Sequence, residues 1–330
     1  MREDILSEVL RSVSLSGAVF FDVAASSPWV AEAPAAASLL PLVMPKAQHL
    51  IEYHVITSGF AWATLIDSRE EPVRLAPGSV IMFPQGDPHA LSSRPEMRAE
   101  PSVGLFAQPA ELSPPFYIEQ FGGGPEQTRL ICGFLGCDLL PFNPVIQALP
   151  RMVHIPDGYT AGDGWLSSLI QAIMMESRRR RVGVDSVLAR LSELLFIEVV
   201  RSHMESLPDE ATGWLAALAD PHVGRIIRLL HENPQRAWTL DTLAREAAVS
   251  RTVLVSRFTE RVGVAPMTYL CHWRMQMAAG RLTRGGASIA QVASEVGYES
   301  EAAFSRAFKR STGLAPGAWR SRRAAGMDEK

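Results

Sequence analysis

The chain has 330 residues, of which 47% are hydrophobic and 20% charged, which is enough for two domains with separate cores and unlike a disordered or fibrous protein. Three cysteines, Cys132, Cys137 and Cys271, are too few for a disulfide framework and lack zinc-finger spacing, so we expect a reducing, cytoplasmic setting. The sequence has no run of about eighteen uncharged apolar residues, and its first residues, MREDILSEVL, lack the apolar core of a secretory signal, so we expect no contact with a membrane.

The charge is distributed unevenly along the chain. Residues 221–330 contain 17 Lys and Arg against 9 Asp and Glu, a net charge of +8, whereas residues 1–220 contain 15 against 26, a net charge of −11. A basic C-terminal third on an acidic remainder predicts a module that binds a polyanion such as double-stranded DNA, joined to a domain with another task.

The first elements in chain order are strands. Short apolar runs such as GAVFFDV, LIEYHVI, AWATLI and SVIMF, separated by Pro- and Gly-rich turns, predict a β-barrel or sandwich over about residues 13–135. Over about residues 142–205 the apolar spacing becomes helical, and we expect these helices to pack on the barrel or on the second subunit of a homodimer. The helix over residues 184–206 has an apolar stripe that forms either the dimer interface or intramolecular core: Leu188, Leu191, Leu195 and Val199.

A polar, turn-rich stretch containing SLPDEATG predicts a linker over residues 206–220, between a domain at 1–205 and an all-helical domain at 221–323. Two segments of the second domain resemble each other: TLDTLAREAAVSRTVLVSRF (239–258) and SIAQVASEVGYESEAAFSRAF (288–308). Each predicts a short helix, a turn and a second helix that begins at a serine, Ser250 or Ser300. Each second helix reaches a core aromatic, Phe258 or Phe308, eight residues later.

Both segments contain the residue types that a helix-turn-helix motif requires. Its two helices cross at a steep angle, so small residues are expected at the crossing, here Ala244, Ala248, Ala293 and Gly297. Ser250 and Ser300 are positioned to act as N-caps. Between the copies, PMTYLCHWRMQMAAGRL predicts a rigid connector helix over residues 266–282, about 25 Å long. The two second helices could then enter successive major grooves, about 34 Å apart.

Residues 237–320 resemble the DNA-binding domain of the AraC/XylS family of transcription regulators, most clearly in IAQVASEVGYESEAAFSRAFKRSTGLAPGAWR. The resemblance implies that the exposed face of each second helix reads bases. The positions carried over are Arg251, Thr252, Val255 and Ser256 in the first copy and Glu301, Ala302, Ser305 and Arg306 in the second. Arg306 is the main candidate for a bidentate contact with guanine, and we expect Arg257 and Lys309 to contact phosphates.

The N-terminal half resembles the cupin-type sensor domains that are joined to such DNA-binding domains. GSVIMFPQGDPH (78–89) fits the second cupin motif, G-x5-P-x-G-x2-H, and Glu52 with Gly59 fits the E-x6-G end of the first. The two histidines of the first motif would fall at Pro45 and Ala47, so two of the four usual metal ligands are missing. The resemblance therefore implies a cupin-like β-barrel that is not a catalytic centre.

Two interpretations of the remaining polar residues stay open. His54 and His89 are either hydrogen-bonded core groups or, with Cys132, ligands of zinc or a similar metal, since imidazole and thiolate suit that ion.

The cysteines also allow two interpretations. Cys132 and Cys137 are either buried small side chains or oxidant-sensing thiols, as the resemblance implies for Cys132. In a straight strand they would lie about 16 Å apart, too far for a disulfide.

These observations predict an α+β protein of two domains, a cupin-like β-barrel followed by helices and an all-α domain with two helix-turn-helix motifs. The predicted function is sequence-specific DNA binding in transcription regulation, without enzymatic activity, controlled by a small-molecule effector, a metal or an oxidant. RNA polymerase is an expected partner if the protein activates transcription. The alternative is a metal-dependent cupin enzyme with an accessory helical domain.

Overall fold

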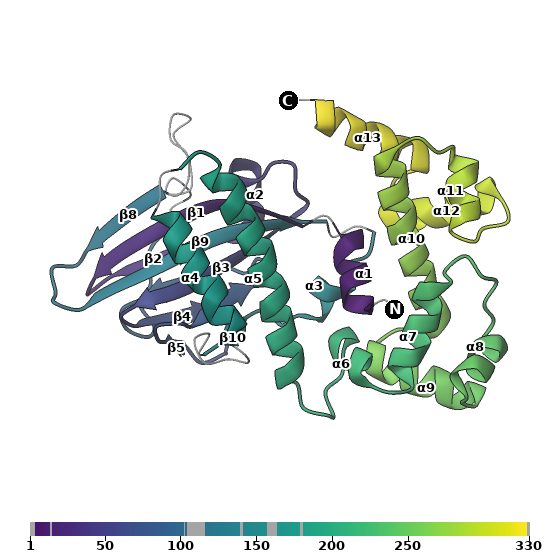
Figure 1. Cartoon of the computed structure of the whole chain (residues 1–330), viewed down its shortest axis with the longest axis horizontal. Coiled ribbons are helices and arrows are strands. Elements are labelled where there is room, and N and C mark those ends of the chain that lie inside the picture. The colour runs from purple at the N-terminus through teal and green to yellow at the C-terminus, as the bar shows by residue number, and fades with distance from the viewer. Residues whose placement is uncertain are drawn as a thin grey trace. The chain divides into compact units, whose positions relative to one another are not determined.

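The computed structural model describes residues 4–13, 15–101, 103, 116–138, 141–156, 164–178 and 181–328 (Figure 1). They form two compact units. The β unit comprises the described parts of Ser14–Asp138 and Leu149–Ser206, and the helical unit those of Met1–Val13, Leu139–Ala148 and Leu207–Lys330. The predicted combination of a β-rich N-terminal domain and an all-α C-terminal domain is confirmed.

The strands of the β unit lie in two sheets. A six-stranded sheet has the order β10-β6-β3-β9-β1-β8 and a four-stranded sheet the order β2-β7-β4-β5. Apolar side chains from both sheets, including Phe83, Leu91 and Phe134, form one core. Among the described residues the strands do not close into one barrel, so the cupin fold is present here as two facing sheets. The strands are β1 (Leu15–Ser26), β2 (Val30–Ala33), β3 (His49–Ser58), β4 (Ala61–Leu65), β5 (Val73–Leu75), β6 (Val80–Phe83), β7 (His89–Ser92), β8 (Phe116–Phe121), β9 (Gln127–Cys137) and β10 (Val153–Ile155).

The turn before β7 depends on a glycine. Gly86 has a φ of +71°, in the left-handed region that L side chains rarely adopt. A Cβ at this position would also lie 2.8 Å from the Cβ of Ala36, at the start of α2 (Ala36–Val43). The glycine therefore lets the chain turn tightly against α2 and enter β7 at His89.

Two further helices, α4 (Trp165–Ser177) and α5 (Val184–Ser206), pack against each other, and α5 lies on β1 (Figure 1). Helix α5 lies so close to β1 that a Cβ on Gly17 of β1 would collide with the backbone of Ala189. Of the four residues in the predicted stripe, Leu188, Leu195 and Val199 are fully buried within this unit, and Leu191 is half-buried. The predicted apolar stripe of the helix over residues 184–206 therefore belongs to the intramolecular core, which was one of its two predicted roles beside a dimer interface.

In the helical unit, α10 connects two helix pairs, α8 with α9 at one end and α11 with α12 at the other (Figure 1). The predicted linker at 206–220 contains a short helix. Two residues of this helix, Trp214 and Leu215, are buried against the rest of the unit. No helix among the described residues is both long and apolar enough to cross a membrane. The helices are α1 (Ile5–Ser12), α3 (Pro144–Ala148), α6 (Trp214–Ala219), α7 (Val223–Glu232), α8 (Leu240–Ala247), α9 (Arg251–Val262), α10 (Pro266–Arg284), α11 (Ile289–Glu295), α12 (Glu301–Thr312) and α13 (Pro316–Asp328).

The N-terminal helix α1 belongs to the helical unit, which differs from the predicted domain at residues 1–205. Its apolar side packs on α3 and α10. The side-chain amide of Gln276 on α10 donates to the carbonyl of Ser12 (3.0 Å) and accepts from the N–H of Phe142 (3.1 Å). Glu8 also lies 3.1 Å from Nδ1 of His231 on α7. These contacts join four segments that are far apart in the sequence.

Candidate nucleic-acid interface and internal pocket

Both predicted helix-turn-helix motifs are present, and their helices begin where the sequence indicates. The hydroxyl of Ser250 accepts a hydrogen bond from the N–H of Val253, and that of Ser300 accepts one from Ala303, both at 3.2 Å. These N-caps satisfy backbone donors that a helix start otherwise leaves unpaired.

The first helices of the two motifs, α8 and α11, begin with the same kind of cap. In α8, Thr239 and Thr242 form a reciprocal capping box, and in α11 Ser288 and Gln291 form another. The predicted connector is α10, which begins at Pro266 and continues to Arg284.

Two of the four predicted crossing residues, Ala244 and Ala293, are buried as expected, whereas Gly297 and Ala248 occupy left-handed turn positions. Ala244 and Ala293 are buried at the helix crossings. Gly297 has a φ of +80°, and a Cβ there would lie 2.5 Å from the carbonyl oxygen of Gln235. Ala248 differs, because it is exposed and is the left-handed C-cap of α8, with a φ of +59°. Ala248 therefore belongs to the turn that ends α8 and not to the crossing of the two helices.

The second helix of the second motif, α12, presents a polar face. Glu301, Ala302, Arg306 and Lys309 are exposed, Ser305 is half-buried, and Phe304 and Phe308 anchor the opposite face in the core. Within the part of the chain that the structure describes, Arg306 and Lys309 have neither an ion pair nor a side-chain hydrogen bond. Their charges are available to a ligand.

The second helix of the first motif, α9, presents fewer free groups. Arg251 and Thr252 are exposed, Val255 is half-buried, and Leu254 is buried as predicted. The hydroxyl of the exposed Ser256 donates to the carbonyl of Thr252, 2.9 Å away in the same helix. Arg251 lies 3.6 Å from Asp241, in a pair exposed on both sides.

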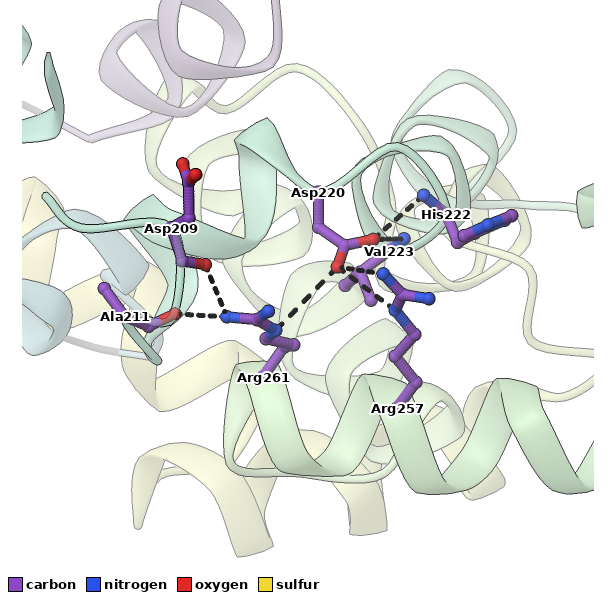
Figure 2. A network of polar contacts seen from close by, with 7 residues as sticks. All are labelled: Asp209, Ala211, Asp220, His222, Val223, Arg257 and Arg261. Atoms are coloured by element: carbon purple, nitrogen blue, oxygen red, sulfur yellow. Dashed lines mark hydrogen bonds and ion pairs between the residues drawn. The ribbon is translucent and has the colours of Figure 1, made fainter.

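Arg257, predicted to contact a phosphate, instead has an intramolecular partner in Asp220 (Figure 2). One oxygen of the Asp220 carboxylate accepts hydrogen bonds from Nε and Nη2 of Arg257 at 3.1 and 3.0 Å. The other oxygen accepts from the N–H groups of His222 (2.9 Å) and Val223 (3.0 Å), at the start of α7. Arg257 thus links α9 to α7, and its charge is already neutralised.

Arg261 extends this network by one helical turn (Figure 2). Its Nε lies 3.8 Å from the same oxygen of Asp220, and its Nη1 donates to the carbonyls of Ala211 (2.6 Å) and Asp209 (3.2 Å). Burial raises the pKa of Asp220, but the hydrogen bonds from Val223, His222 and Arg257 outweigh this and hold the pKa below its ordinary value. Asp220 is not among the residues predicted from the sequence, although an Asp before a helix start is a recognisable capping signal.

The β unit contains an internal pocket between its two sheets, with about 670 Å³ of space, part of which is open to solvent. Most of the lining is apolar, and none of the lining residues is Lys or Arg. The lining residues are Phe21, Val23, Trp29, Ala31, Glu32, Ala33, Glu52, His54, His89, Leu91, Ile118, Leu130, Cys132, Gly133 and Phe134. Glu32 is neutralised by Arg98, whose Nε donates to it at 2.8 Å.

Three buried polar side chains meet at one wall of this pocket. Glu52 and His54 lie two residues apart on β3 and face the same side, and His89 is the first residue of β7 in the opposite sheet. Each offers one ligand atom within 4.8 Å of the others. The predicted set was His54, His89 and Cys132. In the structure the third member of the cluster is Glu52, and Cys132 lines the pocket but lies outside the cluster.

The hydrogen bonds of the histidine pair fix its orientation. Nδ1 of His89 donates to the carbonyl of Asp87 at 3.0 Å, so its Nε2 accepts a hydrogen bond from Nε2 of His54 at 2.8 Å, and the two histidines are hydrogen-bonded core groups, as one of the two interpretations predicted. The ring of Phe83 stacks on His89 with 3.6 Å between ring centres. Oε1 of Glu52 and Nδ1 of His54 have no partner among the described residues.

Burial disfavours the charged form of each of these three groups. Burial raises the pKa of Glu52 to about 8. Burial also lowers the pKa of His54 well below its ordinary value and, against the hydrogen bond to Asp87, lowers that of His89 to about 4.

The two candidate redox cysteines, Cys132 and Cys137, are free thiols on the continuous strand β9. Burial raises the pKa of Cys137 to about 12 and that of Cys132 further. A thiol that stays protonated is a poor nucleophile toward oxidants. The raised pKa values disfavour reactivity of these thiols at neutral pH, and oxidant sensing stays a prediction.

Comparison with known proteins identifies both units. A family described as Cupin matches residues 4–205, and one described as a helix-turn-helix domain matches residues 243–322. An AraC-like transcription regulator of Streptomyces antibioticus is 33% identical over 276 residues, which cover 83% of this chain and 88% of that protein. The HTH-type transcriptional regulator AlkR of Acinetobacter baylyi is 28% identical over 277 residues, covering 80% of this chain and 85% of AlkR.

Among solved structures, the DNA-binding domain of AdpA in complex with a target DNA is 28% identical, covering 34% of this chain and 100% of that one with a TM-score of 0.32. The curated relatives are transcription regulators, and the alternative of a cupin enzyme has no support. The chain therefore belongs to the AraC-like transcription regulators and is a DNA-binding protein with an N-terminal cupin domain and a C-terminal helix-turn-helix domain.

Proposed function

We propose that this regulator recognises specific DNA sequences mainly through α12 and that an effector in the pocket of the β unit controls this binding. The observation that carries the proposal is the free, exposed Arg306 and Lys309 on a helix anchored by Phe304 and Phe308. Arginine fits the two acceptors of a guanine edge, whereas lysine suits a phosphate. The α9 face supplies fewer free polar groups, so its share in base recognition is smaller.

The pocket supports an effector of defined chemistry. Its lining contains no cation, so an anionic compound would be buried without a countercharge. A compound rich in hydroxyl groups would lose more hydrogen bonds to water than the few polar groups of the pocket could replace. A small, uncharged and largely apolar molecule fits, and Nε1 of Trp29, buried and without a partner among the described residues, offers it one donor.

The remaining partners follow from DNA binding. A homodimer would double the contact with the operator, and it would need a surface other than the buried stripe of α5. If the regulator activates transcription, RNA polymerase is the protein it would contact. Since its partner is DNA, we propose that it acts in the cytoplasm.

Selection of genomic fragments with the full-length protein, followed by affinity measurements at several salt concentrations, tests the DNA half of the proposal. We expect the bound fragments to share a sequence motif, and log affinity to fall linearly with log salt. Recovery of fragments that share no motif would contradict sequence-specific recognition.

The effector half is tested with a panel of small neutral apolar compounds and their carboxylate analogues. Neutral compounds should raise the melting temperature and change operator affinity, and their anionic analogues should do neither. Ala31→Leu fills part of the pocket and should abolish the response, whereas Ala37→Leu, on the exposed side of α2, should preserve it. An equal response in both variants would place the effector elsewhere.

A further inference from the structure

Arg274 lies near the middle of α10, between the two helix-turn-helix motifs. Its half-buried side chain reaches the turn that precedes α8 in the first motif. Nε donates to the carbonyl of Pro234 at 2.7 Å, and Nη2 donates to the carbonyl of Arg236 at 2.8 Å. A guanidinium holds its donors in one rigid plane, so these two bonds fix the direction of the turn as well as its distance from α10.

This turn is firmly attached to the first motif. Trp238 is buried, and its Nε1 donates to the carbonyl of Asn233 at 2.9 Å. Cζ of Arg236 lies 4.1 Å from the ring centre of Trp238, and the same guanidinium forms an ion pair with Glu246 on α8. Because the turn is fixed to α8, and α9 packs on α8, the bonds from Arg274 also determine where α9 lies.

Arg274 also contacts the turn of the second motif. A Cβ on Gly297 would lie 2.8 Å from Nη2 of Arg274 and 2.5 Å from the carbonyl oxygen of Gln235. Cζ of Arg274 lies 5.9 Å from the ring centre of Tyr298, and that ring meets Phe304 of α12 edge to face, with 5.7 Å between the ring centres. The turns of the two motifs therefore touch each other, and Arg274 contacts both.

We propose that Arg274 is a positioning residue that holds α9 and α12 at one separation and thereby sets the number of base pairs between the two operator segments that they contact. One inserted base pair moves the second segment by about 3.4 Å and rotates it by roughly 35°, so two helices held in a fixed arrangement fit only one spacing. The consequence for spacing rests on the sequence-specific DNA binding proposed above, whereas the joining of the two turns is a property of the free protein.

Amide hydrogen exchange of the full chain without DNA tests whether Arg274 joins the turns. The N–H groups of Arg236 and Tyr298, one in each turn, donate to the carbonyls of Asn233 (3.2 Å) and Ala293 (2.9 Å). Their exchange rates therefore report on local opening of the turns. Arg274→Ala should raise both rates at least tenfold.

Binding to one operator, and to copies with one, two or three base pairs inserted between the segments contacted by α9 and α12, tests the spacing. The parent chain should lose at least tenfold in affinity with one inserted base pair, and Arg274→Ala less than threefold. Arg281→Ala is the matched control on the same helix, because its guanidinium donates to Glu295 and Gly285, and it should keep the spacing dependence of the parent. The salt slope of Arg274→Ala should equal that of the parent, since a slope lower by about 1 would assign Arg274 to a phosphate.

A second substitution separates the two turns without altering Arg274. The Cβ of Gly297→Ala would collide with the carbonyl of Gln235, so the spacing dependence should weaken as in Arg274→Ala. Gly313→Ala is its control, because Gly313 has a similar φ, +77° against +80°, and a Cβ there meets no atom of the described residues within 4 Å. Gly313→Ala should therefore keep the spacing dependence of the parent chain.

Circular dichroism identifies any variant that fails to fold. Arg274→Lys keeps the charge but loses the planar pair of donors, so it should weaken the spacing dependence in the same direction and decides the result if Arg274→Ala does not fold. The proposal is overturned if either the exchange rates or the spacing dependence of the Arg274 variant equals that of the parent. Fragments that share no motif would contradict the proposed function alone, and the exchange rates would then decide whether Arg274 joins the two turns.

Discussion

The two helix-turn-helix motifs have the same construction, but the cationic side chains of their second helices differ in their intramolecular partners. Each begins with a capping box, continues through a serine N-cap and ends its second helix on a buried phenylalanine, Phe258 or Phe308. In α9 the arginines at positions 257 and 261 are held by Asp220, whereas Arg306 and Lys309 on α12 have no intramolecular partner among the described residues. In the first motif two of the cations thus fix a helix, whereas in the second the corresponding charges are available to a ligand.

The largest effect should come from removing the anchor of α9. Asp220→Ala deletes the acceptor of two backbone N–H groups and of Arg257, and we expect the free energy of unfolding of the helical unit to fall by about 2 kcal/mol. The two arginines remain half-exposed and regain water, which limits the loss. Urea denaturation followed by tryptophan fluorescence measures it.

Asp241→Ala is the matched control for this substitution. Asp241 belongs to the same motif, but its pair with Arg251 is 3.6 Å long and exposed on both sides. Such pairs contribute little to stability. If Asp220→Ala were as stable as Asp241→Ala, Asp220 would not anchor α9.

Arg306→Ala tests base recognition by α12. It should relax discrimination at one base position by about 1–3 kcal/mol while leaving the other positions unchanged. Binding of operator variants with each base substituted in turn measures this. Arg251→Ala provides the comparison from α9, and we expect a smaller change because the exposed face of α9 supplies fewer free polar groups. A loss for Arg306→Ala that is equal on all sequences would assign it to a phosphate.

Lys309→Ala should have a smaller, sequence-independent effect. If Lys309 neutralises one phosphate, its removal lowers the salt slope of log affinity by about 1 and weakens all sequences alike. Arg261→Ala is the control, since its guanidinium already binds protein acceptors and should leave the slope unchanged. Equal slopes for Lys309→Ala and the parent chain would remove Lys309 from the interface.

The sequence predicted the helix-turn-helix motifs well because their determinants are local. Caps, small residues and core aromatics recur within about twenty residues, and the helices begin at Ser250, Pro266 and Ser300 as expected. Arg257 was assigned to phosphate because its partner, Asp220, lies 37 residues away. Nothing in the local pattern indicates that pair.

The β unit was harder to predict because its site joins different sheets. The sequence placed His54 and His89 at one site, but strand alternation alone could not show that Glu52 completes the cluster and Cys132 does not. Likewise, α1 joins the helical unit through Glu8 and His231, which are 223 residues apart. Contacts of this range depend on the packing of whole elements.

The smallest prediction concerns the one turn at which the two motifs differ. Gly297 has both a positive φ and a close neighbour at Gln235, whereas Ala248 has a φ of +59° and is exposed. Glycine removes the left-handed strain of Ala248 but increases the entropy of the unfolded chain, so Ala248→Gly should stabilise the helical unit by roughly 0.5 kcal/mol. Ala247→Gly, one residue earlier inside α8, should destabilise it by about 1 kcal/mol. The two urea midpoints should therefore move in opposite directions, and a shift of both to lower urea would show that Ala248 is not strained.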